Sequence, residues 1–169
     1  MTKNYQTILD AFPLKGEVVS VEPFGNGHIN DTLRVTVKDP DGTEHIRYVL
    51  QRINHQVFQD VETLQRNIFT VTEHIRKKLE AEGDADVDRH VCTFLRTKSG
   101  ERYTTYEGNY WRVMLYIPRS VTVDAVTPES ARSAGRAFGD FQSRLSDIPE
   151  GTLGDTIPHF HDMAFRLQE

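Results

Sequence analysis

The chain has 169 residues, of which 37% are hydrophobic and 27% are charged, a composition typical of one folded domain or of a small domain with part of a second. The formal net charge of −5 at pH 7 argues against a nucleic-acid partner, and no apolar run reaches the length that spans a membrane. Cys92 is the single cysteine and cannot form an intramolecular disulfide, so we expect a reducing compartment, the cytoplasm.

The first third of the sequence predicts a short helix, three strands and a glycine-rich loop between the first two strands. The loop has the sequence FGNGHINDT, residues 24–32. The turn sequence DPDG, residues 39–42, joins the second and third strands, so these two strands form an antiparallel hairpin. The expected bounds are residues 5–12 for the helix and residues 17–24, 32–38 and 46–50 for the strands.

From Asp60 to Leu79 the apolar residues recur every three or four positions, which predicts one long amphipathic helix. Three further strands are expected at residues 90–97, 102–106 and 110–117, because turn sequences separate these runs. Thr127 followed by Pro128 is a typical helix start. The inner stripe expected for this helix consists of Ala131, Ala134, Gly135, Phe138, Gln142 and Leu145. The order of elements predicts an α+β fold whose boundary lies near residues 118–127.

A glycine-rich loop between two antiparallel strands lets backbone N–H groups approach an anion without hindrance from side chains. The spacing is neither that of a Rossmann motif nor that of a P-loop. A plain hairpin loop with positive φ angles is therefore the alternative interpretation of residues 24–32.

Four segments, found in the same order, resemble the aminoglycoside-phosphotransferase-like or choline-kinase-like family of small-molecule kinases. They are FGNGHINDT, YVLQRINHQVF, AGRAFGDFQSRL and TIPHFHD, and within the family they are most similar to the N-acetylhexosamine 1-kinases and their bacterial relatives. The resemblance covers about residues 18–165 and implies a protein-kinase-like amino-terminal lobe at residues 1–117, with a five- to six-stranded antiparallel sheet and one long helix. It further implies a hinge or connector at residues 118–126 and the start of a helical substrate lobe at residues 127–169.

The resemblance implies ATP and Mg²⁺ as cofactors and a sugar as the substrate. Gly25, Asn26, Gly27 and His28 would cover the phosphates, and a cation on the third strand would orient them. Placement by motif puts Gln51 at the position of this cation, whereas alternation puts Arg52 on the same face as the apolar residues of the strand. We favour Arg52 as the charge and Gln51 as a helper, with a solvated edge residue as the alternative for Arg52.

Other positions follow from the same resemblance. Glu62 would hold the cation, or else form a surface pair with Arg66 on the same helix. Met114 would stand at the back of the adenine pocket, and the backbone groups of Leu115, Tyr116 and Ile117 would recognise the adenine. His161 and Asp162 would lie near the sugar, although capping of a following helix by Asp162 is the simpler interpretation. No histidine spacing is typical of a zinc site.

Kinases of this type need an aspartate in a loop of the form H-x-D-x-x-x-x-N and a later aspartate for Mg²⁺. Neither pattern occurs before Glu169, so we expect an amino-terminal part that carries no catalytic residue, is inactive alone and self-associates through its exposed lobe interface. Two alternatives stay open: a non-catalytic nucleotide-binding or regulatory module on the same fold, and an unrelated α+β binding domain.

Overall fold

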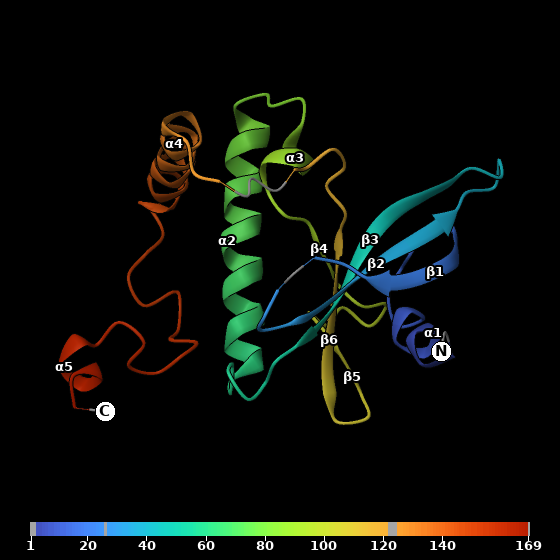
Figure 1. The fold of residues 1–169 in the computed structure, drawn as a ribbon, viewed down its shortest axis with the longest axis horizontal. Coiled ribbons are helices and arrows are strands. Elements are labelled where there is room, and N and C mark those ends of the chain that lie inside the picture. Colours follow the sequence, from blue (N-terminus) through green and yellow to red (C-terminus); the bar gives the residue numbers. More distant parts are fainter. Residues whose placement is uncertain (1–2, 26, 122–124, 169) are drawn as a thin grey trace.

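The structure, a computed structural model, describes residues 3–25, 27–121 and 125–168. They form an α+β fold around an antiparallel six-stranded sheet, as expected (Figure 1). The strands are β1 (Glu17–Pro23), β2 (Asp31–Lys38), β3 (Glu44–Ile53), β4 (Phe94–Leu95), β5 (Thr104–Tyr106) and β6 (Asn109–Leu115). The helices are α1 (Lys3–Leu9), α2 (Val61–Ala81), α3 (Val87–His90), α4 (Pro128–Leu145) and α5 (Met163–Arg166). No helix within these described ranges is long and apolar enough to cross a membrane.

The strand order in the sheet is β1-β2-β3-β6-β4, and β5 also pairs with β6. The predicted hairpin of β2 and β3 is confirmed, and its turn is closed by a hydrogen bond from Gly42 N–H to the C=O of Asp39 at 2.9 Å. Because β3 occupies one edge of β6, the two short strands β4 and β5 share the other edge. The centre of the sheet is therefore the pair formed by β3 and β6.

The two faces of the sheet bury different elements. On one face Leu50 and Val113, both fully buried, pack against Ile8 and Phe12 in the first segment of the chain. On the other face Ile53 packs against residues in the first turn of α2. We call these the α1 face and the α2 face. Side chains alternate between faces along a strand, so neighbouring residues of β3 belong to different faces.

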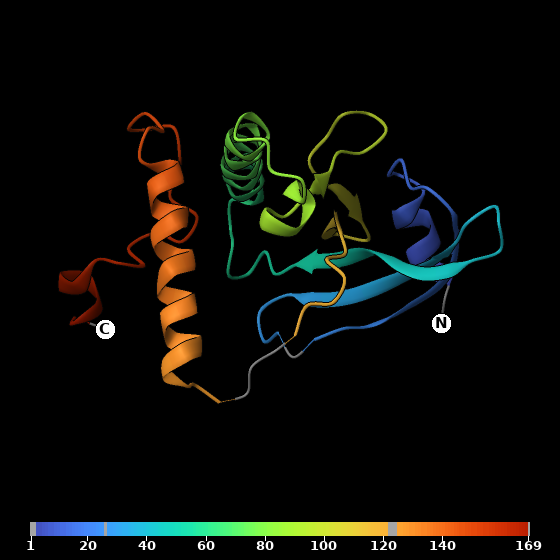
Figure 2. The ribbon, with the colours of Figure 1, turned by 90° about the horizontal axis from the view of Figure 1, so that it is seen from above.

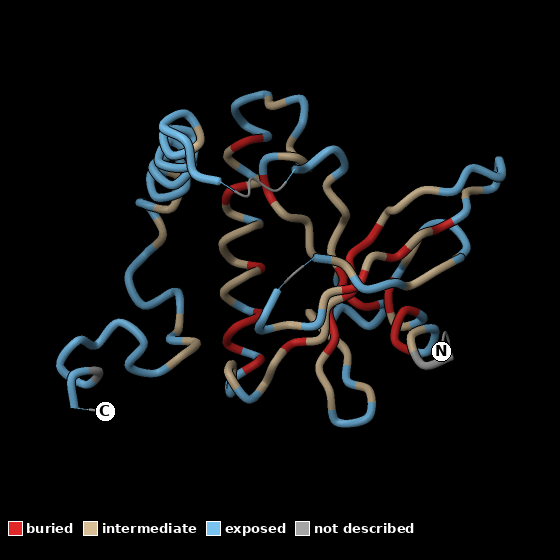
Figure 3. Tube along the Cα trace, viewed as in Figure 1, coloured by how far each residue is buried: buried red, intermediate tan, exposed pale blue. Residues whose placement is uncertain are grey.

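The long helix α2 matches its predicted range closely. Asp60 caps its first turn, since its carboxylate accepts a hydrogen bond from Thr63 N–H at 2.9 Å. Two views show α2 between the sheet and α4 (Figures 1 and 2). Buried residues gather in the sheet and along α2, whereas α4 and α5 are almost entirely exposed (Figure 3). The helix α2 therefore connects the buried part of the molecule to its exposed last segments.

Between α2 and β5 the sequence-based prediction was partly wrong. A strand was expected at residues 90–97, but the structure has the short helix α3 and only two residues of β4 there. Asp84 explains part of the difference, because its carboxylate accepts from the N–H of Asp86 at 2.7 Å and contacts Nδ1 of His90 at 2.6 Å. These local contacts hold the segment in turns and keep it out of the sheet.

The predicted start of α4 is confirmed by a capping box between Thr127 and Ser130. The expected inner stripe of this helix is not buried, and Phe138 is 68% exposed. Only the C-terminal end of the stripe meets α2, where Leu145 packs near Ile75 and Leu79. The sequence pattern indicated an apolar face correctly but could not show that α2 covers so little of it.

Polar contacts attach the segment after α4 to α2. Asp147 accepts hydrogen bonds from Lys78 Nζ at 2.6 Å and contacts His74 Nε2 at 2.9 Å. Further along, the side chain of Asn67 bonds both the N–H and the C=O of Gly154, at 3.1 Å and 2.6 Å. A Cβ atom at Gly154 would lie 2.7 Å from a methyl carbon of Thr63, so only glycine permits this approach.

We expect the attachment of α4 to depend on pH. The hydrogen bonds of Lys78 and then of His74 lower the pKa of Asp147 from 3.8 to about 2. Since the folded pKa is the lower one, this stabilisation is complete above pH 3.8 and is lost as the pH falls towards 2. Hydrogen exchange of peptides covering α4 should therefore accelerate within that window, and the step should vanish in Asp147→Asn. The variant Asp155→Asn is the matched control, and protection of α4 that does not change across the window would contradict this assignment.

Candidate functional site

The glycine loop connects β1 to β2 at one end of the sheet. The N–H of Phe24 donates to the C=O of Thr32 at 2.9 Å and closes the base of the loop. Gly25 has φ of +78°, a conformation that side chains disfavour, so this position requires glycine. Gly27 and His28 are exposed, while Asn26, which was also assigned to the phosphates, lies outside the described residues. The described part of the loop therefore presents Gly25 and Gly27 to solvent, together with the side chains of His28 and Ile29.

The start of the loop contacts Tyr116, the first residue after β6. The ring of Phe24 lies 5.8 Å from the ring of Tyr116, centroid to centroid, in an edge-to-face arrangement. These two residues are far apart in the sequence, and their contact brings the start of the glycine loop next to the segment that leads to the expected hinge.

The structure separates Gln51 from Arg52. Gln51 lies on the α2 face, where its Nε2 donates to Oγ1 of Thr32 at 2.9 Å. Arg52 lies on the α1 face and donates to Asp31 at 2.6 Å and to Asn109 at 3.3 Å. The alternation of side chains along β3 correctly predicted that Arg52 shares a face with Tyr48 and Leu50. That face is the one packed on α1. Gln51 and Arg52 therefore lie on opposite faces of the sheet, so a phosphate bound on one face can contact only one of the two side chains.

Arg112 on β6 is directly opposite Gln51 and was not identified from the sequence. Its Nε and Nη2 both donate to Oε1 of Gln51, at 2.9 Å and 2.6 Å. Arg112 as a whole is 9% exposed, and its Nη1 atom has no hydrogen-bond partner in the described part of the chain. The sequence did carry a signal, because Arg112 interrupts the apolar run YWRVML of a predicted strand.

The surroundings of Arg112 are apolar and neutral. Its guanidinium lies 5.2 Å from the centre of the Phe94 ring, and that ring lies 6.2 Å from the ring of Phe69 on α2. Burial lowers the pKa of Arg112 to about 10, so the group is still charged at neutral pH. Burial raises the pKa of the neighbouring Cys92 thiol, which therefore supplies no negative charge.

Glu62 and Met114, two further residues expected to bind nucleotide, lie in different surroundings. Glu62 points to the exposed side of α2 and pairs with Arg102 at 2.9 Å, so it holds neither Gln51 nor Arg52. Met114 is half-buried on the α2 face, opposite Phe94.

The end of β6 and the two residues after it offer fewer free backbone groups than expected. The N–H groups of Leu115 and Tyr116 donate to the C=O groups of Thr93 and Arg47, at 2.8 Å and 2.9 Å. The N–H of Ile117 has no backbone partner within the described ranges. Of the three residues expected to recognise adenine, Ile117 is the one whose N–H is available to a ligand.

His161 and Asp162 are far from the glycine loop, because they precede α5 on the outer side of α2 (Figures 1 and 2). Asp162 caps α5 by accepting from Phe165 N–H at 3.0 Å. This contact is the simpler alternative that the sequence suggested. The described residues contain no group of three His, Cys, Asp or Glu side chains that could hold a metal ion.

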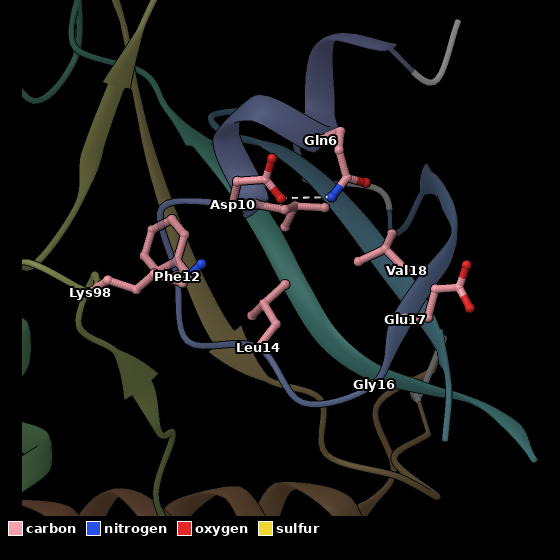
Figure 4. A pocket seen from close by; sticks show the side chains of 9 residues that line it. Gln6, Asp10, Phe12, Leu14, Gly16, Glu17, Val18 and Lys98 are labelled. Carbon is pink, nitrogen blue, oxygen red and sulfur yellow. Dashed lines mark hydrogen bonds between the residues drawn. The ribbon is translucent and has the colours of Figure 1, made fainter. Parts of the chain in front are cut away.

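A separate pocket lies on the α1 face between α1 and β1. It has a volume of about 380 Å³ and is lined by Phe12, Leu14 and Val18 together with polar residues (Figure 4). Its polar groups include Gln6 and Asp10, which hydrogen-bond to each other at 2.8 Å. Nothing in this lining is both buried and unpartnered, so the α2 face offers the better candidate site.

No known protein-family model matches this sequence. The function is therefore argued from the geometry of the site and from the resemblance of the segments described above.

Gln65 on α2 is a second residue that sequence analysis missed. Its side chain is fully buried, one helical turn before Phe69, and neither its Nε2 nor its Oε1 has a hydrogen-bond partner among the described residues. Such an orphaned amide costs about 1–3 kcal/mol of folding stability.

Gln65→Leu, which keeps the volume, should therefore raise the free energy of unfolding in denaturant titrations. A lower value in the variant would contradict this expectation and indicate that the amide has a bound partner.

Proposed function

We propose that this chain forms the nucleotide-binding lobe of an ATP-dependent phosphotransferase of small molecules. ATP would supply the γ-phosphoryl group, and the acceptor would be a hydroxyl of an N-acetylhexosamine or a related sugar, as the resemblance of the segments implies. Mg²⁺ would accompany the nucleotide. The proposal concerns binding first, since transfer needs catalytic groups that the sequence does not supply in the expected pattern.

One observation carries this proposal: the glycine loop contacts the end of β6, where the resemblance places the adenine. The contact of Phe24 with Tyr116 places the loop beside the segment expected to bind adenine. Gln51 is bonded to Thr32 at the base of the same loop and to Arg112 behind it. Loop, third strand and connector are the three parts that hold a nucleotide in the kinase-like plan.

The order of the elements also supports the proposal. In the kinase-like plan a single helix interrupts an antiparallel sheet, and a hinge leads to a helical region. Here α2 follows β3, the sheet resumes with β4 to β6, and α4 follows the connector. The exposed apolar side chains of Phe138 and Phe141 on α4, 68% and 45% exposed, are the surface through which self-association would occur.

Thermal unfolding with ligands tests the proposal. ATP with Mg²⁺ should raise the melting temperature, because a ligand that binds only the folded state stabilises it by about 2.7 kcal/mol at a hundredfold excess over Kd. A kinase lobe and a non-catalytic nucleotide module both predict this rise, and sugar-dependent consumption of ATP separates them. An unrelated α+β binding domain predicts no response to ATP at any concentration.

Gly27→Val tests the role of the loop. The nearest atom to an added Cβ at Gly27 is the Asn30 carbonyl oxygen at 3.7 Å, an ordinary contact distance, so the variant should fold normally. The valine side chain should keep phosphate away from the loop and weaken ATP binding about tenfold or more. Gly135→Val on the exposed part of α4 is the matched control. Equal ATP affinity of a folded Gly27→Val protein and the wild type would refute the assignment of this loop.

Arg52→Ala tests which face binds the nucleotide. The change removes a partly exposed ion pair with Asp31, which is worth about 0.2–1 kcal/mol. Because Arg52 lies on the α1 face, the affinity for ATP measured by titration should stay within about twofold of the wild type. A selective loss of ATP affinity, with adenosine affinity retained, would return Arg52 to the phosphate site.

A further inference from the structure

Among the described residues, Arg112 is the arginine that is both buried and without a counter-charge. It is the one charged side chain that the described ranges bury, and no carboxylate forms an ion pair with it there. Seven arginines that are more accessible to water have carboxylate partners, namely Arg34, Arg47, Arg52, Arg76, Arg96, Arg102 and Arg144. A buried cation without a partner is strongly unfavourable, so its presence calls for an anion from outside the chain.

We propose that Arg112, and not a residue of β3, is the cation of this site, and that it takes a phosphate group of a nucleotide or polyphosphate. The inference rests on the proposed function for the identity of the nucleotide. The binding of an anion does not depend on the proposed function, because the unpaired charge of Arg112 is a property of the fold itself.

The contact between Arg112 and Gln51 shows how an anion would bind. The amide oxygen of Gln51 accepts from both Nε and Nη2, the pair of parallel donors that arginine offers side-on to phosphate. A neutral amide oxygen satisfies these donors without neutralising the charge. A phosphate oxygen would take the same two donors with a full negative charge and displace the amide.

The second bond of Gln51 places this exchange next to the base of the glycine loop. Its Nε2 donates to Thr32, which also closes the base of the loop through its carbonyl oxygen. The path from Arg112 through Gln51 to Thr32 thus crosses the α2 face from β6 to β2. An anion that replaces the Gln51 amide would lie between Arg112 and the loop.

This arrangement also explains why Gln51 stands where the resemblance predicts a cation. A lysine or arginine at position 51 would face Arg112 directly across the strand pair, and like charges opposite each other are unfavourable. With the cation on β6, the residue on β3 has to be neutral. The cation of the site therefore lies on β6, opposite the β3 position where the resemblance predicts it.

Thermal unfolding at low salt, with tripolyphosphate, ATP or adenosine, tests the inference. Tripolyphosphate and ATP should both raise the melting temperature of the wild type. In Arg112→Met the affinity for each should fall about tenfold or more, with little change for adenosine. Arg52→Met is the matched control, an arginine removed from the opposite face. Arg112→Met should fold, because it replaces a buried charge by an apolar side chain of similar length.

Gln51→Glu gives a second and independent test. It adds a carboxylate at the position that already accepts from Arg112, so it should raise the melting temperature without ligand and abolish the response to tripolyphosphate. Retention of the tripolyphosphate response in either Arg112→Met or Gln51→Glu, or its absence from the wild type, would overturn the inference.

The two proposals fail in different ways. A wild type that responds equally to ATP and tripolyphosphate, with the response lost in Arg112→Met, keeps the anion site and removes the case for a nucleotide. An ATP response that survives in Arg112→Met keeps the nucleotide site and overturns the role of Arg112.

Discussion

The pairing of β3 with β6 is the contact on which the rest of the structure depends. Its register sets Leu50 opposite Val113 and Gln51 opposite Arg112. The first pair belongs to the core under α1, and the second pair forms the polar centre of the α2 face. A slip of one residue would move each side chain of β3 to the wrong face, so a single register determines both the core and the candidate site.

The same strand pair contains a stabilising and a destabilising part. Leu50 and Val113 are removed completely from water, whereas Arg112 is buried beside them without a counter-charge. Local rules of stability are broken most often where a protein binds something, because a binding site has to leave groups unsatisfied until the ligand arrives. The apolar side of the pair offsets the unfavourable charge on the other side.

The helix α2 has two different roles along its surface. Towards the sheet it contributes apolar side chains such as Leu64 and Phe69, and these contacts are independent of pH. Towards the last segments of the chain it contributes Asn67, His74 and Lys78, whose partners are polar and accessible to water. We therefore infer that the sheet and α2 form the stable unit and that α4 is held to it by weaker, charge-dependent contacts.

The sequence by itself determined the elements that local chemistry specifies: the hairpin around the DPDG turn, the span of α2, and the start of α4 at Thr127. It also showed that Gln51 and Arg52 point to opposite faces of β3. Only the tertiary structure decided which face meets α1, which meets α2, and that Arg112 lies opposite Gln51. The reason is that a period of two relates neighbours along one strand, whereas the partner of a strand is chosen by contacts between residues about 60 positions apart, which no local pattern encodes.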